Sequence, residues 1–166
     1  VPLGCSIELG PFKIDLITLT HSIPEPNGLA IRTPLGVVLH TGDWKIDPTP
    51  ILRDPTDEKK LRALGEEGCL VLVGDSTNAV RDGRSPSEAD VAKTIAELVR
   101  TARGRVTVTT FASNVARLRA VADAARAADR EVVVIGRAME RVVQIARETG
   151  YLDGVQDFRP MEAYGY

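Results

Sequence analysis

The pattern of hydrophobic and polar positions divides the chain into two parts with different periods. In the first part, apolar residues alternate with polar ones or follow one another without a break, as in β-strands. The predicted strands cover residues 5–9, 12–20, 29–33, 37–41 and 69–74. The last of these runs is almost wholly apolar, which is typical of a buried strand. A short helix is expected at residues 57–66.

From Ser85 the apolar residues follow the period of amphipathic helices. Ser85-Pro86-Ser87-Glu88 has the pattern of a capping box, with Ser85 as the cap and proline at the first helical position. The predicted helices extend to about Ala102 and over residues 114–128 and 138–149, with strands at 106–110 and 131–135 between them. Alternating strands and helices predict βαβ units and a parallel sheet.

Composition narrows the class of protein without naming it. The 166 residues are 43% hydrophobic and 27% charged, which is typical of a folded globular protein. The net charge of −2 excludes a strongly basic surface that coats nucleic acid, although residues 76–166 hold 14 basic and 12 acidic side chains. No apolar run approaches the roughly 18 residues of a membrane span, so we expect no membrane partner. The change of pattern predicts a boundary near residues 76–84.

The cysteines predict a reduced protein. Cys5 and Cys69 lie far apart without a CxxC spacing, so neither a disulfide framework nor a zinc knuckle is indicated. Both adjoin apolar runs, which favours buried, reduced thiols. This usage fits a cytoplasmic location.

Candidate chemistry lies at the ends of the predicted strands. His21 ends one strand and opens a proline-rich loop, while Asp43 ends another and opens a second loop. If the two strands are neighbours in one sheet, the imidazole and the carboxylate can share a cation. The alternative for His21 is a hydrogen-bonded structural histidine. His40 lies inside a predicted strand, which favours a packed or supporting role.

Asp75 follows the apolar run 69–74, where a carboxylate is costly unless it is paired. Two roles stay open: an Asx-turn with Ser76 and Thr77, or the orientation of a metal-binding histidine.

The second part offers features that suit an anionic, base-containing ligand. Phe111, Ser113 and Asn114 join a predicted strand to a helix, with Ser113 as the expected cap; free amides at a helix start attract phosphate, and an exposed Phe can stack on a base. Arg137 follows the next strand, at the sheet edge where parallel sheets bind ligands. The alternatives are an ordinary turn with a core Phe and a surface arginine.

Taken together, five segments resemble one known family. They are residues 20–25 (THSIPE), 40–45 (HTGDWK), 74–78 (GDSTN), 109–114 (TTFASN) and 136–139 (GRAM). In this order they resemble ribonuclease J, the β-CASP family of the metallo-β-lactamase superfamily.

The resemblance implies an α/β fold with two parts. Residues 1–76 are expected to form part of a metallo-β-lactamase αββα domain, and residues 77–166 part of a β-CASP domain with a parallel, Rossmann-like sheet. By position, His21 matches a metal ligand, Asp43 a bridging metal ligand with a catalytic role, and Asp75 a catalytic acidic residue. The residues expected to face RNA are Phe111, Ser113, Asn114 and Arg137.

The resemblance also implies an activity: cleavage of RNA phosphodiester bonds, internally and from the 5′ end, at a centre with two zinc ions, in an enzyme that is a homo-oligomer when intact. No HxHxDH motif occurs in this sequence. We therefore expect a central fragment that is inactive alone. The alternatives are a small-molecule hydrolase with the same first domain and a non-catalytic α/β binding module.

Overall fold

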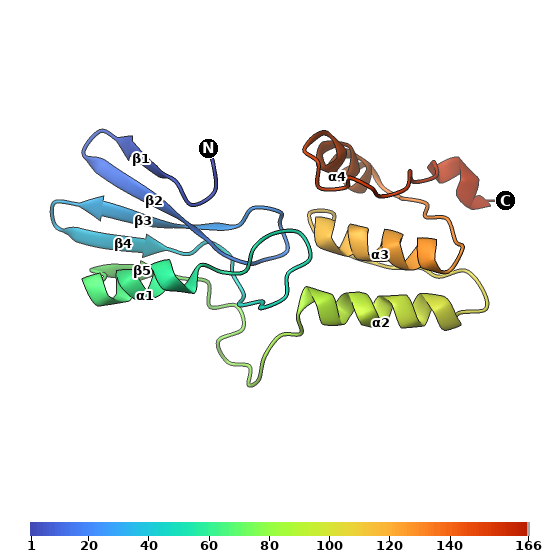
Figure 1. Ribbon diagram of the computed structural model, residues 1–166, viewed down its shortest axis with the longest axis horizontal. Coiled ribbons are helices and arrows are strands. Elements are labelled where there is room, and N and C mark those ends of the chain that lie inside the picture. Colours follow the sequence, from blue (N-terminus) through green and yellow to red (C-terminus); the bar gives the residue numbers. More distant parts are fainter. Residues whose placement is uncertain (166) are drawn as a thin grey trace. The chain divides into compact units, whose positions relative to one another are not determined.

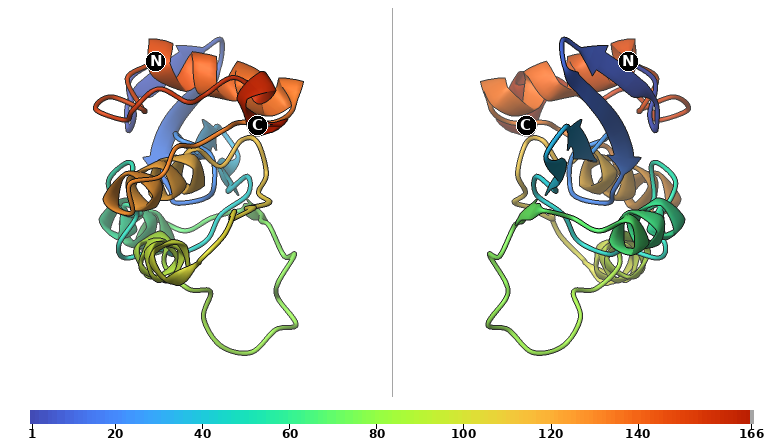
Figure 2. Two further views of the ribbon diagram at one scale, coloured as in Figure 1. Left: turned by 90° about the vertical axis from the view of Figure 1, so that its right-hand side faces the viewer. Right: turned by 90° about the vertical axis from the view of Figure 1, so that its left-hand side faces the viewer.

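The computed structural model describes residues 1–165, which form two compact units (Figure 1). Unit 1 comprises Val1–His21 and Glu25–Pro86, and unit 2 comprises Ser22–Pro24 and the residues from Ser87 on. Residues 74–87 make a long loop outside the helices and strands, drawn in green in Figure 2. The domain boundary after residue 76, expected from the family resemblance, stays a prediction.

The described part of unit 1 contains a five-stranded sheet in the order β1-β2-β3-β4-β5. Its strands are β1 (Ser6–Leu9), β2 (Phe12–Thr18), β3 (Asn27–Thr33), β4 (Gly36–His40) and β5 (Val71–Val73). Neighbours from β1 to β4 are antiparallel, whereas β4 and β5 are parallel. The strands predicted at residues 5–9, 12–20, 29–33 and 37–41 are confirmed.

These pairings give β2, β4 and β5 the same direction. Their carboxyl ends therefore lie at one end of the sheet, opposite the tight turns that join β1 to β2 and β3 to β4 (Figure 1). The loops that open at His21, Asp43 and Asp75 all leave the sheet there.

The core of unit 1 lies between this sheet and helix α1 (Glu58–Glu67). Its buried residues are Ile17, Leu19, Ala30, Val37 and Leu64. The Asp57 side chain caps α1 by accepting a hydrogen bond from the Lys60 backbone N–H, and Lys60 Nζ donates to the Gly4 carbonyl at 2.7 Å. The helix is thus attached to the chain segment before β1.

The prediction of a buried strand at residues 69–74 is wrong. The strand forms, but Leu70 and Leu72 are 61% and 66% exposed. Among the described strands β5 pairs with β4 alone, so it is a sheet edge. Cys69, next to it, is a free and exposed thiol, and Cys5 is half-buried, so the expectation of two buried thiols is also wrong. An apolar run indicates a strand, but it does not show what covers the strand.

The described part of unit 2 is built on helices α2 (Glu88–Thr101), α3 (Val115–Ala127) and α4 (Arg137–Glu148) and the 3-10 helix η1 (Met161–Gly165). Helix α3 is the most buried of these, and α2 packs along it. The buried positions of α3 are Val115, Ala116, Leu118, Ala120, Ala122, Ala124 and Ala125. Small alanine side chains let neighbouring backbones approach closely, which suits a central helix.

Two predicted caps are displaced. Ser87, not Ser85, caps α2: its hydroxyl accepts the Asp90 N–H at 3.1 Å and donates to the Asp90 carboxylate at 2.8 Å. Asn114, not Ser113, caps α3 by accepting the Arg117 N–H at 2.9 Å. In both cases a second side chain that can cap stood close by in the sequence.

The parallel, Rossmann-like sheet expected in the second part is not assembled among residues 87–165. Residues 106–110 and 131–135 lie outside the assigned strands, and Val133 pairs with Arg159 in an isolated parallel bridge. Val106 and Val108 are 37% and 39% exposed. A strand needs a hydrogen-bonded neighbour as well as apolar side chains. In the described residues, the two segments have a single bridge to another part of the chain, the one from Val133 to Arg159.

Arginines hold unit 2 together. Arg117, in α3, forms an ion pair with Glu88 at the start of α2 at 3.2 Å, and the Glu88 side chain is 8% exposed. Arg147 donates to the Val155 and Gln156 carbonyls and lies over the Phe158 ring, 5.3 Å from its centroid. Much of the arginine excess of the second half is therefore used inside the fold.

We expect Glu88→Gln to lower the free energy of unfolding of unit 2 by about 2–3 kcal/mol, because it leaves the Arg117 charge without its partner. The loss should stay below the largest losses known for broken buried ion pairs, since the Arg117 side chain is 23% exposed. Urea denaturation followed by circular dichroism at 222 nm measures it. Glu97→Gln is the matched control, because Glu97 pairs with Arg100 on the exposed face of α2 and should change stability by less than about 0.5 kcal/mol. Equal losses in the two variants would contradict the assignment.

Candidate active site at the carboxyl end of the sheet

The His21 loop is joined to the Asp43 loop by backbone pairing. Thr20 and Lys45 form an isolated antiparallel bridge, in which the Lys45 N–H donates to the Thr20 carbonyl at 2.8 Å. His21 follows Thr20 directly and is half-buried, and Asp43 is exposed two positions before Lys45. The structure therefore brings these two loop tips to the same place.

The Asp75 loop joins them through the parallel pair β4–β5. The Thr41 N–H donates to the Val73 carbonyl at 3.0 Å, and the Asp75 N–H donates to the Thr41 hydroxyl at 3.2 Å. The Asp75 loop thus begins beside Gly42, and Gly42 is the residue directly before Asp43. Gly42 has a φ of +60°, a conformation that favours glycine, so the turn into Asp43 depends on this residue type.

The pKa of Asp75 lies below its ordinary value. The largest cause is the Thr77 hydroxyl, which donates to the carboxylate at 2.6 Å, followed by the Thr77 N–H at 2.9 Å; a backbone hydrogen bond from Trp44 and the charge of His21 act in the same direction. Asp75 therefore stays ionised at neutral pH. Asp75 forms the Asx-turn considered from the sequence, through its hydrogen bonds with Thr77. The orientation of a metal-binding histidine stays a prediction.

His40 does not pack inside the sheet, which was one of the two roles, packed or supporting, that the sequence favoured for it. It ends β4 with an exposed side chain, and its Nδ1 accepts the Gly42 N–H at 3.1 Å. The imidazole therefore supports the turn that leads to Asp43.

The donor types at this end of the sheet suit a divalent cation, but the set is incomplete. Among residues 1–165, no three His, Cys, Asp or Glu side chains lie close enough together to hold a metal ion. An imidazole and a carboxylate are two ligands, and a zinc site takes three or four from the protein. His21 and Asp43 alone therefore do not fit a whole metal centre.

The candidate ligand-binding residues of unit 2 lie on its surface, with one exception. Phe111 is 83% exposed, so it is not the core residue of an ordinary turn, and Ser113 is exposed at the start of α3. Asn114 is buried, and its side chain is occupied in capping α3.

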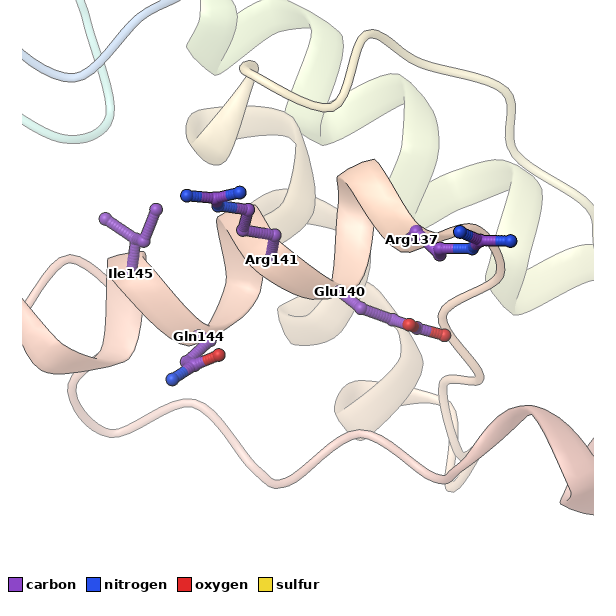
Figure 3. Close-up of a pocket in the computed structure, with 5 residues that line it drawn as sticks. All are labelled: Arg137, Glu140, Arg141, Gln144 and Ile145. Carbon is purple, nitrogen blue, oxygen red and sulfur yellow. The ribbon is translucent and has the colours of Figure 1, made fainter.

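Arg137 is the first residue of α4 and lines an open groove of about 550 Å³ (Figure 3). The other lining residues are Glu140, Arg141, Gln144 and Ile145. In the described part of the chain, neither Arg137 nor Arg141 forms an ion pair, in contrast to Arg117 and Arg147. Figure 3 shows their guanidinium groups turned to different sides of the helix. Sequence reasoning missed Arg141, which lies one helical turn from Arg137.

The family comparison gives the class of protein. Residues 103–162 match the model of the ribonuclease J beta-CASP domain, so unit 2 contains a β-CASP segment of the metallo-β-lactamase superfamily. The α/β fold class expected from the sequence is confirmed.

Curated homologues named ribonuclease J match the chain over nearly its whole length. It is 53% identical to ribonuclease J of Sinorhizobium meliloti over 163 residues, which are 98% of this chain and 29% of that protein. It is 47% identical to the Thermus thermophilus protein, covering 85% of this chain and 25% of the relative, and 50% identical to the Corynebacterium glutamicum protein, covering 87% and 20%. The chain thus spans less than a third of these curated relatives.

A solved structure shares the fold. The crystal structure of a protein of unknown function from Enterococcus faecalis V583 has a TM-score of 0.65 at 17% identity, covering 98% of this chain and 41% of that one. In the described residues, no helix is both long enough and apolar enough to cross a membrane.

Proposed function

We propose that this chain supplies part of the hydrolytic centre and part of the RNA-contacting surface of a zinc-dependent ribonuclease. The observation that carries the proposal is the convergence of His21, Asp43 and Asp75 at one end of the unit 1 sheet, in a chain 53% identical to a relative named ribonuclease J. The reaction is hydrolysis of RNA phosphodiester bonds, both internally and from the 5′ end, in RNA processing and decay.

His21, Asp43 and Asp75 have different roles in the proposed centre. His21 and Asp43 would be two of the ligands of a centre with two zinc ions, which when bound would supply positive charge for the phosphate and a Lewis acid for water. Asp75 accepts hydrogen bonds from Thr77 and Trp44 and keeps its charge beside His21. Residues outside this chain complete the ligand set, so the chain alone is inactive.

The exposed residues of unit 2 carry the contact with RNA. Phe111 offers a free aromatic face for a base, and Ser113 and Arg137 offer a hydroxyl and a cation for phosphate oxygens. Asn114 holds the start of α3, which sets the direction of the Phe111 turn. We assign residues 1–76 to the metallo-β-lactamase domain and 77–166 to the β-CASP domain of a cytoplasmic, homo-oligomeric enzyme.

The first test places this chain in a complete enzyme. The matching stretch of the S. meliloti ribonuclease J is replaced by this chain, and the chimera is assayed on single-stranded RNA with a 5′ monophosphate. We expect cleavage by the chimera, and a fall of about a hundredfold or more in kcat for Asp43→Asn, because the amide removes the anionic donor to a cation whose charge contributes several kcal/mol.

Asp54→Asn is the control for this test. Asp54 is an exposed carboxylate in the segment that follows Asp43, and its loss should leave kcat within about twofold. A folded chimera with no RNA cleavage, or a fully active Asp43→Asn variant, would show that the assignment is wrong. Cleavage of a small ester or lactone in place of RNA would favour the small-molecule hydrolase.

The second test concerns base stacking by Phe111. Phe111→Ala should raise the Kd of the full chain for a short fluorescent single-stranded RNA by about 5- to 150-fold, because stacking on an aromatic ring contributes ~1–3 kcal/mol per base. Fluorescence anisotropy at fixed salt measures it. Leu35→Ala is the control, since Leu35 is 87% exposed in unit 1 and should not affect binding; equal effects of the two changes would refute a stacking role.

The third test concerns the phosphate contact of Arg137. Arg137→Gln should reduce the slope of log Kd against log salt concentration by about 0.7, the value for one phosphate contact on a single strand. The same anisotropy assay at several salt concentrations gives the slope. Arg62→Gln removes an exposed arginine that pairs with Glu58 in α1 and should leave the slope unchanged. An unchanged slope for Arg137→Gln would exclude this contact.

A further inference from the structure

We propose that two buried threonines, Thr20 and Thr41, are positioning residues that set the relative places of the His21, Asp43 and Asp75 loop tips. The inference rests on the proposed function, because it treats these tips as one site. Neither threonine is among the residues expected to have a role from the sequence. Each lies at the carboxyl end of a strand segment, directly before a loop that carries a site residue.

Thr20 is 5% exposed and forms hydrogen bonds with two other segments. Its hydroxyl donates to the Lys45 carbonyl and accepts the Asp47 N–H at 3.1 Å. Its own N–H donates to the Thr56 hydroxyl at 3.1 Å, and the two hydroxyl oxygens are 2.9 Å apart. One side chain thus holds the residue before His21 against the segment after Asp43.

The neighbourhood of this hydroxyl explains why it has a defined geometry. Asp47 is 2% exposed, and its carboxylate accepts the Thr49 N–H at 2.9 Å and lies 3.7 Å from Lys45 Nζ. Thr56 is 9% exposed, and the next residue, Asp57, donates its N–H to the Thr18 carbonyl at 2.9 Å. In a buried polar network each lost partner leaves another group unsatisfied, so the arrangement resists small displacements.

Thr41 makes the corresponding link to Asp75. It is 9% exposed, its hydroxyl accepts the Asp75 N–H at 3.2 Å, and it donates to the Gly42 carbonyl at 2.7 Å. The same hydroxyl therefore touches the residue before Asp43 and the backbone of Asp75. Together Thr20 and Thr41 connect all three tips through backbone groups.

Hydrogen exchange of the full chain, measured residue by residue by NMR, tests the proposal. Thr20→Val and Thr41→Val keep the side-chain shape and remove the hydroxyl, whereas Thr20→Ser and Thr41→Ser keep the hydroxyl. In the valine variants we expect the protection of the Asp47 amide and of the Asp75 amide, respectively, to fall by at least about tenfold, because a buried donor loses its acceptor. The serine variants should restore protection to within about threefold.

A purely structural role would not move the second readout. If the threonines position the tips, Thr20→Val shifts the His21 ring resonances and Thr41→Val shifts the Trp44 amide, while the protection of the β1–β2 hairpin stays within about twofold. Thr33→Val is the control, since Thr33 bonds the Gly36 carbonyl in the opposite turn and should change none of these signals. If Thr20→Val does not fold, the Thr41 pair decides the question.

Wild-type protection of Asp47 and Asp75 in the valine variants would overturn the proposal. So would an equal loss of protection across the whole sheet, or unmoved His21 and Trp44 signals. None of these measurements uses RNA cleavage, so their failure is distinct from an inactive chimera, which would count against the proposed function.

Discussion

The candidate site depends on the shared direction of β2, β4 and β5. A side chain at a strand end can meet another only when both strands end on the same side of the sheet. Here two antiparallel steps separate β2 from β4, and β5 is added in parallel after a connection that includes α1. Had β5 been antiparallel to β4, Asp75 would have left the sheet at the opposite end, far from His21 and Asp43.

Unit 2 follows a different principle. Its described elements are held by helix packing around α3 and by arginine side chains that reach carboxylates and backbone carbonyls. Arg130 donates to the Gly104 carbonyl just after α2, and Arg119 donates to the Tyr151 carbonyl just after α4. These contacts complete polar groups near helix ends that would otherwise be unsatisfied. An arginine excess in a sequence is therefore weak evidence for phosphate binding until the paired arginines are removed from the count.

Sequence reasoning was most successful where the evidence was local. The strands β1–β4 and the existence of α2, α3 and α4 follow from apolar periods, and the structure bears them out. For His21 and Asp43 the sequence analysis required neighbouring strands; β3 lies between β2 and β4, and the tips meet because both strands run in the same direction. What failed was the burial of residues 69–74 and the strand at residues 106–110. The residues of a segment do not show which other element covers it or pairs with it. The same limit hid Thr20 and Thr41, whose partners in other segments are 25 to 36 positions away, farther than any local pattern can span.

The contrast between the buried threonines and the exposed Asp43 has a physical reason. A carboxylate or imidazole that binds a ligand has to keep its own lone pairs available, so it cannot also be fixed by strong internal hydrogen bonds. Asp43 meets this demand by being exposed, with its position set by the backbone around it. Neutral hydroxyls such as those of Thr20 and Thr41 can be buried and satisfied at lower cost than charges. The positions of the tips are thus set by neutral hydroxyls, one residue before His21 and two residues before Asp43, while the Asp43 side chain stays exposed.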